Sequence, residues 1–124
     1  MSIIKEMVKW DIERNLIEFN KKNEVNMLMS EVNEFIDAPN EHEEIDGLAD
    51  VIKVSVGAIS KKGYDVELVL EEMLKEISSR KQNPTQKEIW EKWGAEGKWE
   101  KDKTQDPKTL YKADYSKCLL KNSN

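Results

Sequence analysis

Apolar residues recur at helical intervals along four successive segments, and this periodicity restricts the fold more than any other feature of the chain. The segments cover residues 2–20, 23–38, 41–62 and 66–82. No stretch shows the alternation of a half-buried strand, and the 124 residues include only 5 Gly and 3 Pro. We therefore predict an all-α protein with an antiparallel four-helix core.

Capping signals divide these segments. Asn40 is a good N-cap, and Glu43 three residues later completes the spacing of a capping box. Gly63 suits the position after a helix C-terminus, and Asp65 is a second predicted N-cap. The turn before Asn40 is short, so the second and third helices should pack antiparallel. The residues expected to face inward on the first helix are Ile4, Val8, Ile12 and Leu16.

The composition is that of one acidic, soluble domain. The chain carries a net charge of −5 and 36% charged residues, with a pI near 5.1. This charge argues against nucleic acid or an anionic membrane surface as the main partner. Cys118 is the only cysteine, and the N-terminal segment mixes charges into its first turns. We expect a cytoplasmic protein without a disulfide framework, a signal peptide or a spanning helix.

The composition changes after residue 82. Residues 1–82 form the expected helical core, and residues 83–124 hold three of the 4 Trp residues. Thr85 and Glu88 have the spacing of another capping box. We predict a short helix followed by a Trp-rich C-terminal arm that completes the same domain.

Two pairs of acids interrupt the apolar faces of the second and third helices. Glu31 and Glu34 in "MSEVNEF" are three residues apart, and Asp46 and Asp50 in "DGLADVIKV" are four apart, so each pair lies on one side of its helix. Acids at a core edge are costly unless they are paired or bind a cation. Antiparallel packing would let the pairs face each other and form a divalent-cation site.

A simpler interpretation remains open for each pair. An ExxE spacing is common on the solvated helices of acidic proteins. Asp46 would favour the N-terminal end of a helix dipole, and Asp50 would pair with Lys53 or Lys61.

Together, "SEVNEF" and the later "DGLADVIKVSVGAISKKGYD" resemble the all-α nucleoside triphosphate pyrophosphohydrolases of the MazG-like and phosphoribosyl-ATP pyrophosphohydrolase group. The resemblance covers roughly residues 20–81 and is greatest to the phage and bacterial branch with a DxxxD second motif. It implies a MazG-like core and a Mg²⁺-dependent enzyme, with Mn²⁺ as a possible substitute. Such an enzyme cleaves the α–β phosphoanhydride of a (deoxy)nucleotide, giving the monophosphate and pyrophosphate. The implied metal ligands are Glu31, Glu34, Asp46 and Asp50.

The chain departs from the family pattern at two positions. Ser30 stands where members often have the first of two glutamates, and Gly47 stands where many have the glutamate of an ExxD motif. Asp46 would then substitute from the neighbouring position. The family's phosphate-binding segment after the fourth helix has two candidates here, "SSRKQ" at 78–82 and "KADYSKC" at 112–118.

The chemistry of a triphosphate suggests further roles. An acidic pocket can bind it only through cations, and a carboxylate not saturated by metal could deprotonate the attacking water. Glu34 is our choice for that base, because it lies nearer the polar side of its helix. Trp10 and Asn15 are candidates to stack on and read a base, although core packing is an alternative for each. Candidates for holding the phosphates are Lys53, Arg80, Lys81, Lys112 and Lys117, each of which could equally be a solvated surface charge.

The expected partners are a nucleoside triphosphate and further copies of the chain. The apolar third helix and the Trp-bearing arm carry more apolar surface than one small core hides, which predicts a homodimer or homotetramer. Two alternatives compete with the enzyme. One is a noncatalytic helical interaction module, and the other is a protein that binds a nucleotide without cleaving it.

Overall fold

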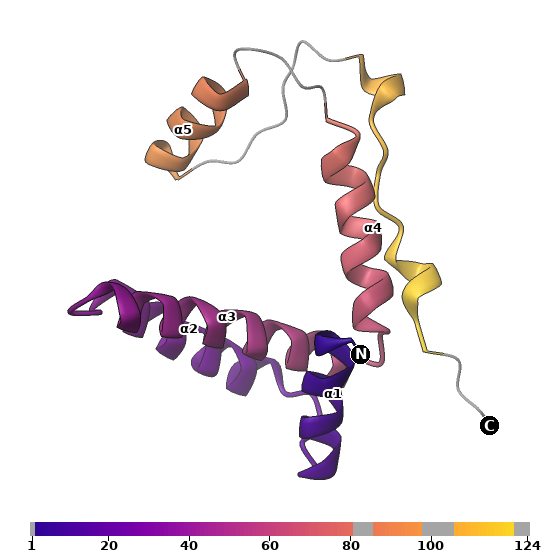
Figure 1. The fold of residues 1–124 in the computed structure, drawn as a ribbon. Coiled ribbons are helices and arrows are strands. Elements are labelled where there is room, and N and C mark those ends of the chain that lie inside the picture. Colours follow the sequence, from indigo (N-terminus) through magenta and orange to yellow (C-terminus); the bar gives the residue numbers. More distant parts are fainter. Residues whose placement is uncertain (1, 81–85, 98–105, 121–124) are drawn as a thin grey trace. The chain divides into compact units, whose positions relative to one another are not determined.

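The structure is a computed structural model that describes residues 2–80, 86–97 and 106–120, and this described part is helical without any β-strand (Figure 1). The predicted all-α class is confirmed. None of the described helices is both long enough and apolar enough to cross a membrane. The elements are α1 (Ile3–Glu13), α2 (Lys21–Ile36), α3 (Glu41–Lys61), α4 (Val66–Ser78), α5 (Gln86–Glu96) and the 3-10 turns η1 (Pro107–Thr109) and η2 (Tyr115–Cys118).

The chain divides into two compact units. The first comprises Met1–Val69 together with Ser116–Asn124, and the second comprises Leu70–Tyr115. The first unit contains both predicted pairs of acids. The expectation that residues 83–124 complete one domain with residues 1–82 stays a prediction.

Helices α2 and α3 form the antiparallel hairpin that the sequence predicts, and they run side by side in Figure 1. The side chain of Asn40 caps α3 by accepting a hydrogen bond of 2.9 Å from the backbone N–H of Glu43. At the other end of the hairpin, Lys61 Nζ lies 2.7 Å from Glu24 Oε1, and both side chains are largely buried. The start of α2 therefore lies beside the end of α3.

Helix α1 is shorter than predicted. It ends at Glu13 instead of residue 20, because Asn15 adopts a left-handed backbone conformation with φ of 58° that stops the helix. Leu16 then follows the helix, and its side chain is 44% exposed. Ile12 is 58% exposed, so the inward face predicted for α1 is wrong at Ile12 and Leu16.

A buried ion pair fastens α1 to α3. Asp11 Oδ1 lies 2.8 Å from Lys53 Nζ, and Asp11 is only 5% exposed. The second carboxylate oxygen fits against Gly57, where an added Cβ would lie 2.8 Å from it. Gly57 therefore gives the carboxylate room to reach the surface of α3.

The turn between α3 and α4 forms backbone hydrogen bonds with residues 118–120. Gly63 has φ of 87°, as its predicted position after α3 requires. Asp65 caps α4 through the N–H of Leu68 at 3.3 Å, which confirms the second predicted N-cap. Backbone hydrogen bonds join Asp65 N to Cys118 O at 2.8 Å and Leu120 N to Gly63 O at 2.9 Å. Cys118 is buried by this arrangement.

In the second unit, a buried carboxylate on α4 holds the segment before η2. Glu72 is 2% exposed and accepts hydrogen bonds from the hydroxyl of Tyr111 and, at 3.1 Å, from the backbone N–H of Asp114. Glu76 accepts from the N–H of Ala113 at 3.1 Å. The segment 111–114 is thus ordered by side chains of α4.

The short helix predicted after residue 85 is present as α5. Trp90 and Trp93 belong to it by their backbone, while their side chains and all of Trp99 lie outside the described residues. The predicted Trp-rich arm therefore stays a prediction.

Candidate metal centre

Three carboxylates from α2 and α3 converge in the first unit. Glu31, Glu34 and Asp50 each offer one oxygen atom, and these three atoms lie within 4.8 Å of one another. Glu31 and Asp50 are partly buried, and Glu34 is exposed. Asp46 lies one turn earlier on α3, is exposed and does not belong to this group, so its role as a ligand stays a prediction.

Gly47 brings the two helices close together beside the acids. A Cβ at this position would lie 3.1 Å from both Cα and N of Phe35. The backbone of α3 can therefore approach the backbone of α2 only because residue 47 has no side chain. This contact gives a structural reason for the glycine at the position where the resembled family often has glutamate.

The electrostatics of the group centre on Glu31. Its pKa is raised from 4.5 to about 7, first by a hydrogen bond shared with Glu34, then by burial and by the negative charges of Glu34 and Asp50. Glu31 Oε2 is buried and has no hydrogen-bond partner among the described residues. Without a cation, Glu31 is therefore about half protonated at pH 7, whereas a bound cation would relieve both the repulsion and the unsatisfied oxygen.

The two lysines of α3 form ion pairs with carboxylates outside the group of Glu31, Glu34 and Asp50. The sequence left open that Asp50 pairs with Lys53 or Lys61, but Lys53 pairs with Asp11 and Lys61 pairs with Glu24. No ion pair to Glu31, Glu34 or Asp50 occurs within residues 2–80, 86–97 and 106–120. The negative charge of the group is left for a ligand to neutralise.

The donor set suits a hard divalent cation. Three carboxylates supply only oxygen ligands, which Mg²⁺, Mn²⁺ and Ca²⁺ prefer, and the described residues place no cysteine or histidine in the group. Mg²⁺ usually binds one or two protein carboxylates and keeps water or phosphate oxygens in its remaining positions. Three ligands that each offer one oxygen fill half of an octahedral shell, so a cation held here would keep positions for water or other oxygen ligands.

Two cationic side chains lie over the ring of Trp10, a predicted base-stacking residue. Arg14 Cζ lies 3.9 Å from the centre of its ring and Lys53 Nζ lies 4.9 Å from it. Lys53 thus contacts both Trp10 and Asp11. The predicted roles of Trp10 in stacking and of Lys53 in phosphate binding stay predictions.

One hydrogen bond in the second unit links described parts of the chain at the two candidate phosphate-binding segments. Tyr111 N donates a 2.9 Å hydrogen bond to Ser79 Oγ, which joins "SSRKQ" to the residue just before "KADYSKC". Arg80 is partly buried, Lys112 and Lys117 are exposed, and Lys81 lies outside the described residues. Their predicted contacts with phosphate are untested.

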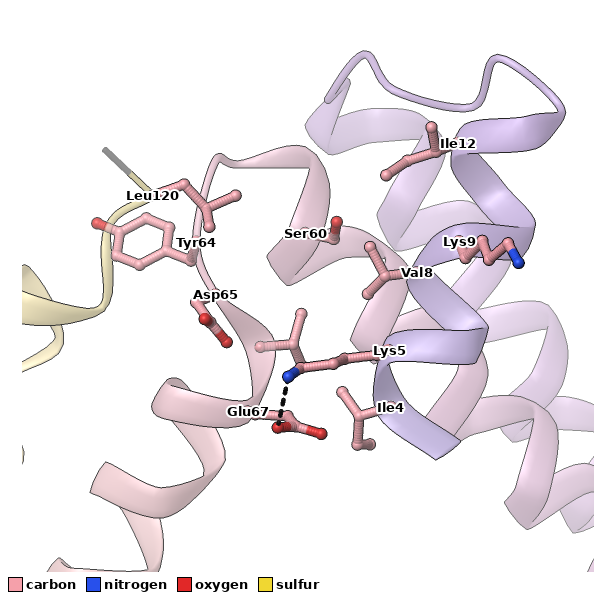
Figure 2. A pocket seen from close by; sticks show the side chains of 11 residues that line it. Ile4, Lys5, Val8, Lys9, Ile12, Ser60, Tyr64, Asp65, Glu67 and Leu120 are labelled. Atoms are coloured by element: carbon pink, nitrogen blue, oxygen red, sulfur yellow. Dashed lines mark ion pairs between the residues drawn. The ribbon is translucent and has the colours of Figure 1, made fainter. Parts of the chain in front are cut away.

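Two cavities lie in the first unit outside the carboxylate group. One, of about 260 Å³, is lined mainly by apolar side chains of α1, the start of α4 and Leu120, and Lys5 and Glu67 form an ion pair of 3.9 Å at its edge (Figure 2). It contains none of the predicted site residues. The other, of about 680 Å³, includes the predicted base-reading residue Asn15.

The second cavity also holds residues that the sequence analysis missed. Asn20, Asn23 and Asn26 line it together with the Glu24–Lys61 ion pair. Their spacing of three residues in "NKKNEVN" places side-chain amides close together around the first turns of a helix, which is a signal that the sequence contained.

Comparison with known proteins gives no assignment, since no family model, no curated protein and no solved structure matches the chain.

Proposed function

We propose that the chain is a Mg²⁺-dependent nucleoside triphosphate pyrophosphohydrolase that cleaves the α–β phosphoanhydride of a (deoxy)nucleotide. The observation that carries the proposal is the convergence of Glu31, Glu34 and Asp50, with a buried oxygen of Glu31 that lacks a partner among the described residues. The resemblance of the two acidic motifs to MazG-like enzymes adds the reaction class. A MazG-like core and a cytoplasmic location belong to the same proposal.

The three carboxylates would bind the cation, with Asp46 as a further ligand from the preceding turn. Mg²⁺ bound there would neutralise phosphate charge and polarise the anhydride, and Mn²⁺ would substitute for it. Because the protein group is negative, a triphosphate would bind it only together with the cation. The cation therefore determines whether the triphosphate group binds to the carboxylates.

Glu34 is the proposed general base because it is the exposed member of the group. Its carboxylate would orient a water molecule and accept a proton from it. The water oxygen forms a bond to one phosphorus of the α–β anhydride while the bond from that phosphorus to the bridging oxygen breaks. The products are a nucleoside monophosphate and pyrophosphate, and the proton leaves Glu34 for solvent.

Positive side chains beyond the carboxylates would hold the departing pyrophosphate. Lys53 is the candidate on α3, and its ammonium group would have to be shared between Asp11 and a phosphate. The other candidates are Arg80, Lys81, Lys112 and Lys117.

A second copy of the chain is the proposed cover for the apolar surface of the hairpin. Only Val56, Val66 and Cys118 are buried apolar side chains among the described residues. In contrast, Ile36 is 68% exposed, Ile45 59% and Ile52 57%. Monomers rarely leave such surface open, so we expect a homodimer or homotetramer in which the site lies near a subunit boundary.

The test is pyrophosphate release from a panel of canonical nucleoside and deoxynucleoside triphosphates with Mg²⁺. The parent chain should release pyrophosphate and the monophosphate from at least one of them, and Glu31→Gln should not. Glu71→Gln, the same change at an exposed position of α4, is the matched control and should retain activity.

Two other results would reject the proposal in different ways. Mg²⁺-dependent nucleotide binding without pyrophosphate would indicate a binding protein. Neither binding nor turnover with any nucleotide would favour a noncatalytic interaction module.

A further inference from the structure

The cavity of about 680 Å³ lies where the chain enters α2. Its polar lining is mainly neutral, since Asn15, Asn20, Asn23 and Asn26 contribute four side-chain amides. Leu16 and Met27 add apolar surface. Both the volume and the mixture of apolar walls with a few polar groups are typical of small-molecule sites.

Three of the four amides are available to a ligand. Asn20 Oδ1 already accepts the N–H of Asn23 at 3.1 Å as the cap of α2. The side chains of Asn15, Asn23 and Asn26 form no hydrogen bond with the described part of the chain. Each amide offers two donors and an acceptor, which is the combination that recognises the edge of a nucleobase.

Two of the three charged residues that line the cavity neutralise each other, and the third is an acid. Lys61 and Glu24 pair at 2.7 Å, so the lysine is not free to attract an anion. Glu18 is a further lining residue and is exposed. A neutral polar ring suits this lining better than a phosphate group does.

Part of the lining of the cavity lies on the same face of α2 as the carboxylate group. Asn20, Glu24, Met27, Glu31 and Glu34 follow one another at spacings of four and three residues, which keeps them on one side of a helix. Glu24 and Glu31 are separated by seven residues, or about 10 Å along the axis. This separation is comparable to the distance from the phosphate to the far edge of the base in one nucleotide.

From these observations we infer that the amide-lined cavity is the nucleobase subsite of the nucleotide whose phosphates meet the cation at Glu31, Glu34 and Asp50. The choice of a nucleotide as ligand rests on the proposed function. The base packs its faces against Leu16 and Met27, and the amides of Asn15, Asn23 and Asn26 bind its polar edge. The cavity therefore sets which base is preferred.

The test separates this subsite from catalysis by working without metal. The four canonical deoxynucleoside 5′-monophosphates are titrated to about 10 mM in EDTA, a range that detects a Kd of about 1 mM. Binding is followed through the side-chain amide signals of asparagine in nitrogen-15 NMR spectra. Inorganic phosphate is titrated in parallel, because it has the phosphate group that all four monophosphates share but no base.

At least one monophosphate should shift the amide signals of Asn15, Asn23 and Asn26, while phosphate should not. Asn26→Ala, which suits a helix, should weaken this binding by about 2- to 10-fold through the loss of a hydrogen bond. Asn15→Gly removes the amide and keeps the left-handed backbone, so it should have a similar effect. Asn33→Ala makes the same change outside the cavity on α2 and should leave the affinity unchanged.

The inference fails if no monophosphate shifts these signals, if phosphate alone reproduces the shifts, or if Asn33→Ala weakens binding as much as Asn26→Ala. Pyrophosphate release without amide shifts would leave the hydrolase standing and reject the subsite. Amide shifts without pyrophosphate release would leave the subsite standing and reject the hydrolase.

Discussion

Replacing Glu31 with glutamine should stabilise the protein without metal and abolish its response to Mg²⁺. The pKa of Glu31 is raised from 4.5 to about 7, so the folded state binds its proton more tightly than the unfolded chain does. The folded state therefore loses stability as the pH rises from 4.5 to about 7. Glutamine resembles the protonated carboxyl group and does not ionise. A chain with glutamine at this position therefore keeps its stability as the pH rises.

The size of the effect follows from the pKa. Each tenfold change in proton affinity is worth about 1.4 kcal/mol, which gives an upper limit of about 3 kcal/mol above neutral pH. Because Glu31 is partly exposed, solvent screening reduces this to about 1–2 kcal/mol. The melting temperature of Glu31→Gln should thus exceed that of the parent by about 3–8 °C near pH 8. The difference should disappear near about pH 4, where the carboxyl group is protonated in both states.

Thermal melting with and without Mg²⁺ checks both parts of the prediction. At a concentration one hundred times its Kd, Mg²⁺ should stabilise the parent by about 2.7 kcal/mol and Glu31→Gln much less. Glu71→Gln should melt as the parent does under every condition. Equal melting of Glu31→Gln and Glu71→Gln at high pH would refute the repulsion, and a parent chain indifferent to Mg²⁺ would refute the metal centre.

Three further predictions concern the hairpin that carries the site. Gly47→Ala should lower the free energy of unfolding, measured with denaturant, by about 1–3 kcal/mol, because the new Cβ would lie 3.1 Å from the backbone of Phe35. The same variant should respond less to Mg²⁺, because the added Cβ separates the two helices. An unchanged Mg²⁺ response would show that the close approach does not position the acids. Lys61→Met should lower the free energy of unfolding by about 3–5 kcal/mol, because Glu24 would stay buried without its cation, and adding Glu24→Gln should restore most of this stability. A double variant that is less stable than Lys61→Met alone would contradict the pairing. Light scattering at micromolar concentration should give the mass of a dimer or tetramer, and a mass near 14.5 kDa would refute association.

The parts of the fold that depend on local signals were predictable. Asn40, Gly63 and Asp65 occupy the helix ends that their side chains or backbone freedom favour, and the short turn at Asn40 specifies the antiparallel hairpin. The convergence of Glu31 and Glu34 with Asp50 follows from that hairpin and from helical spacing.

Features that depend on the backbone conformation of a single residue, or on partners distant in the sequence, were not predictable. The apolar period of α1 continues through Leu16, but a single left-handed residue, Asn15, ends the helix first. The close contact at Gly47 is made with α2, and the sequence of α3 alone does not contain that information. The amide-lined cavity likewise needs the loop at Asn15 to lie against α2, which only the folded chain shows.

The ion pairs of α3 keep its two lysines from neutralising the carboxylates of Glu31, Glu34 and Asp50. Lys53 and Lys61 are the two lysines of α3, and each is held by a carboxylate of another helix at 2.8 Å or less. Asp11 and Glu24 are themselves buried, so releasing either lysine toward Asp50 would leave an unpaired buried charge. The fold thus keeps its own cations away from Glu31, Glu34 and Asp50, whose charge can then be neutralised by protons or by metal.

As protons leave Glu31 near pH 7, the affinity for a divalent cation should rise, and Mg²⁺ binding should tighten between about pH 6 and pH 8. A titration of Mg²⁺ affinity that is flat over this range would mean that the cation binds without Glu31.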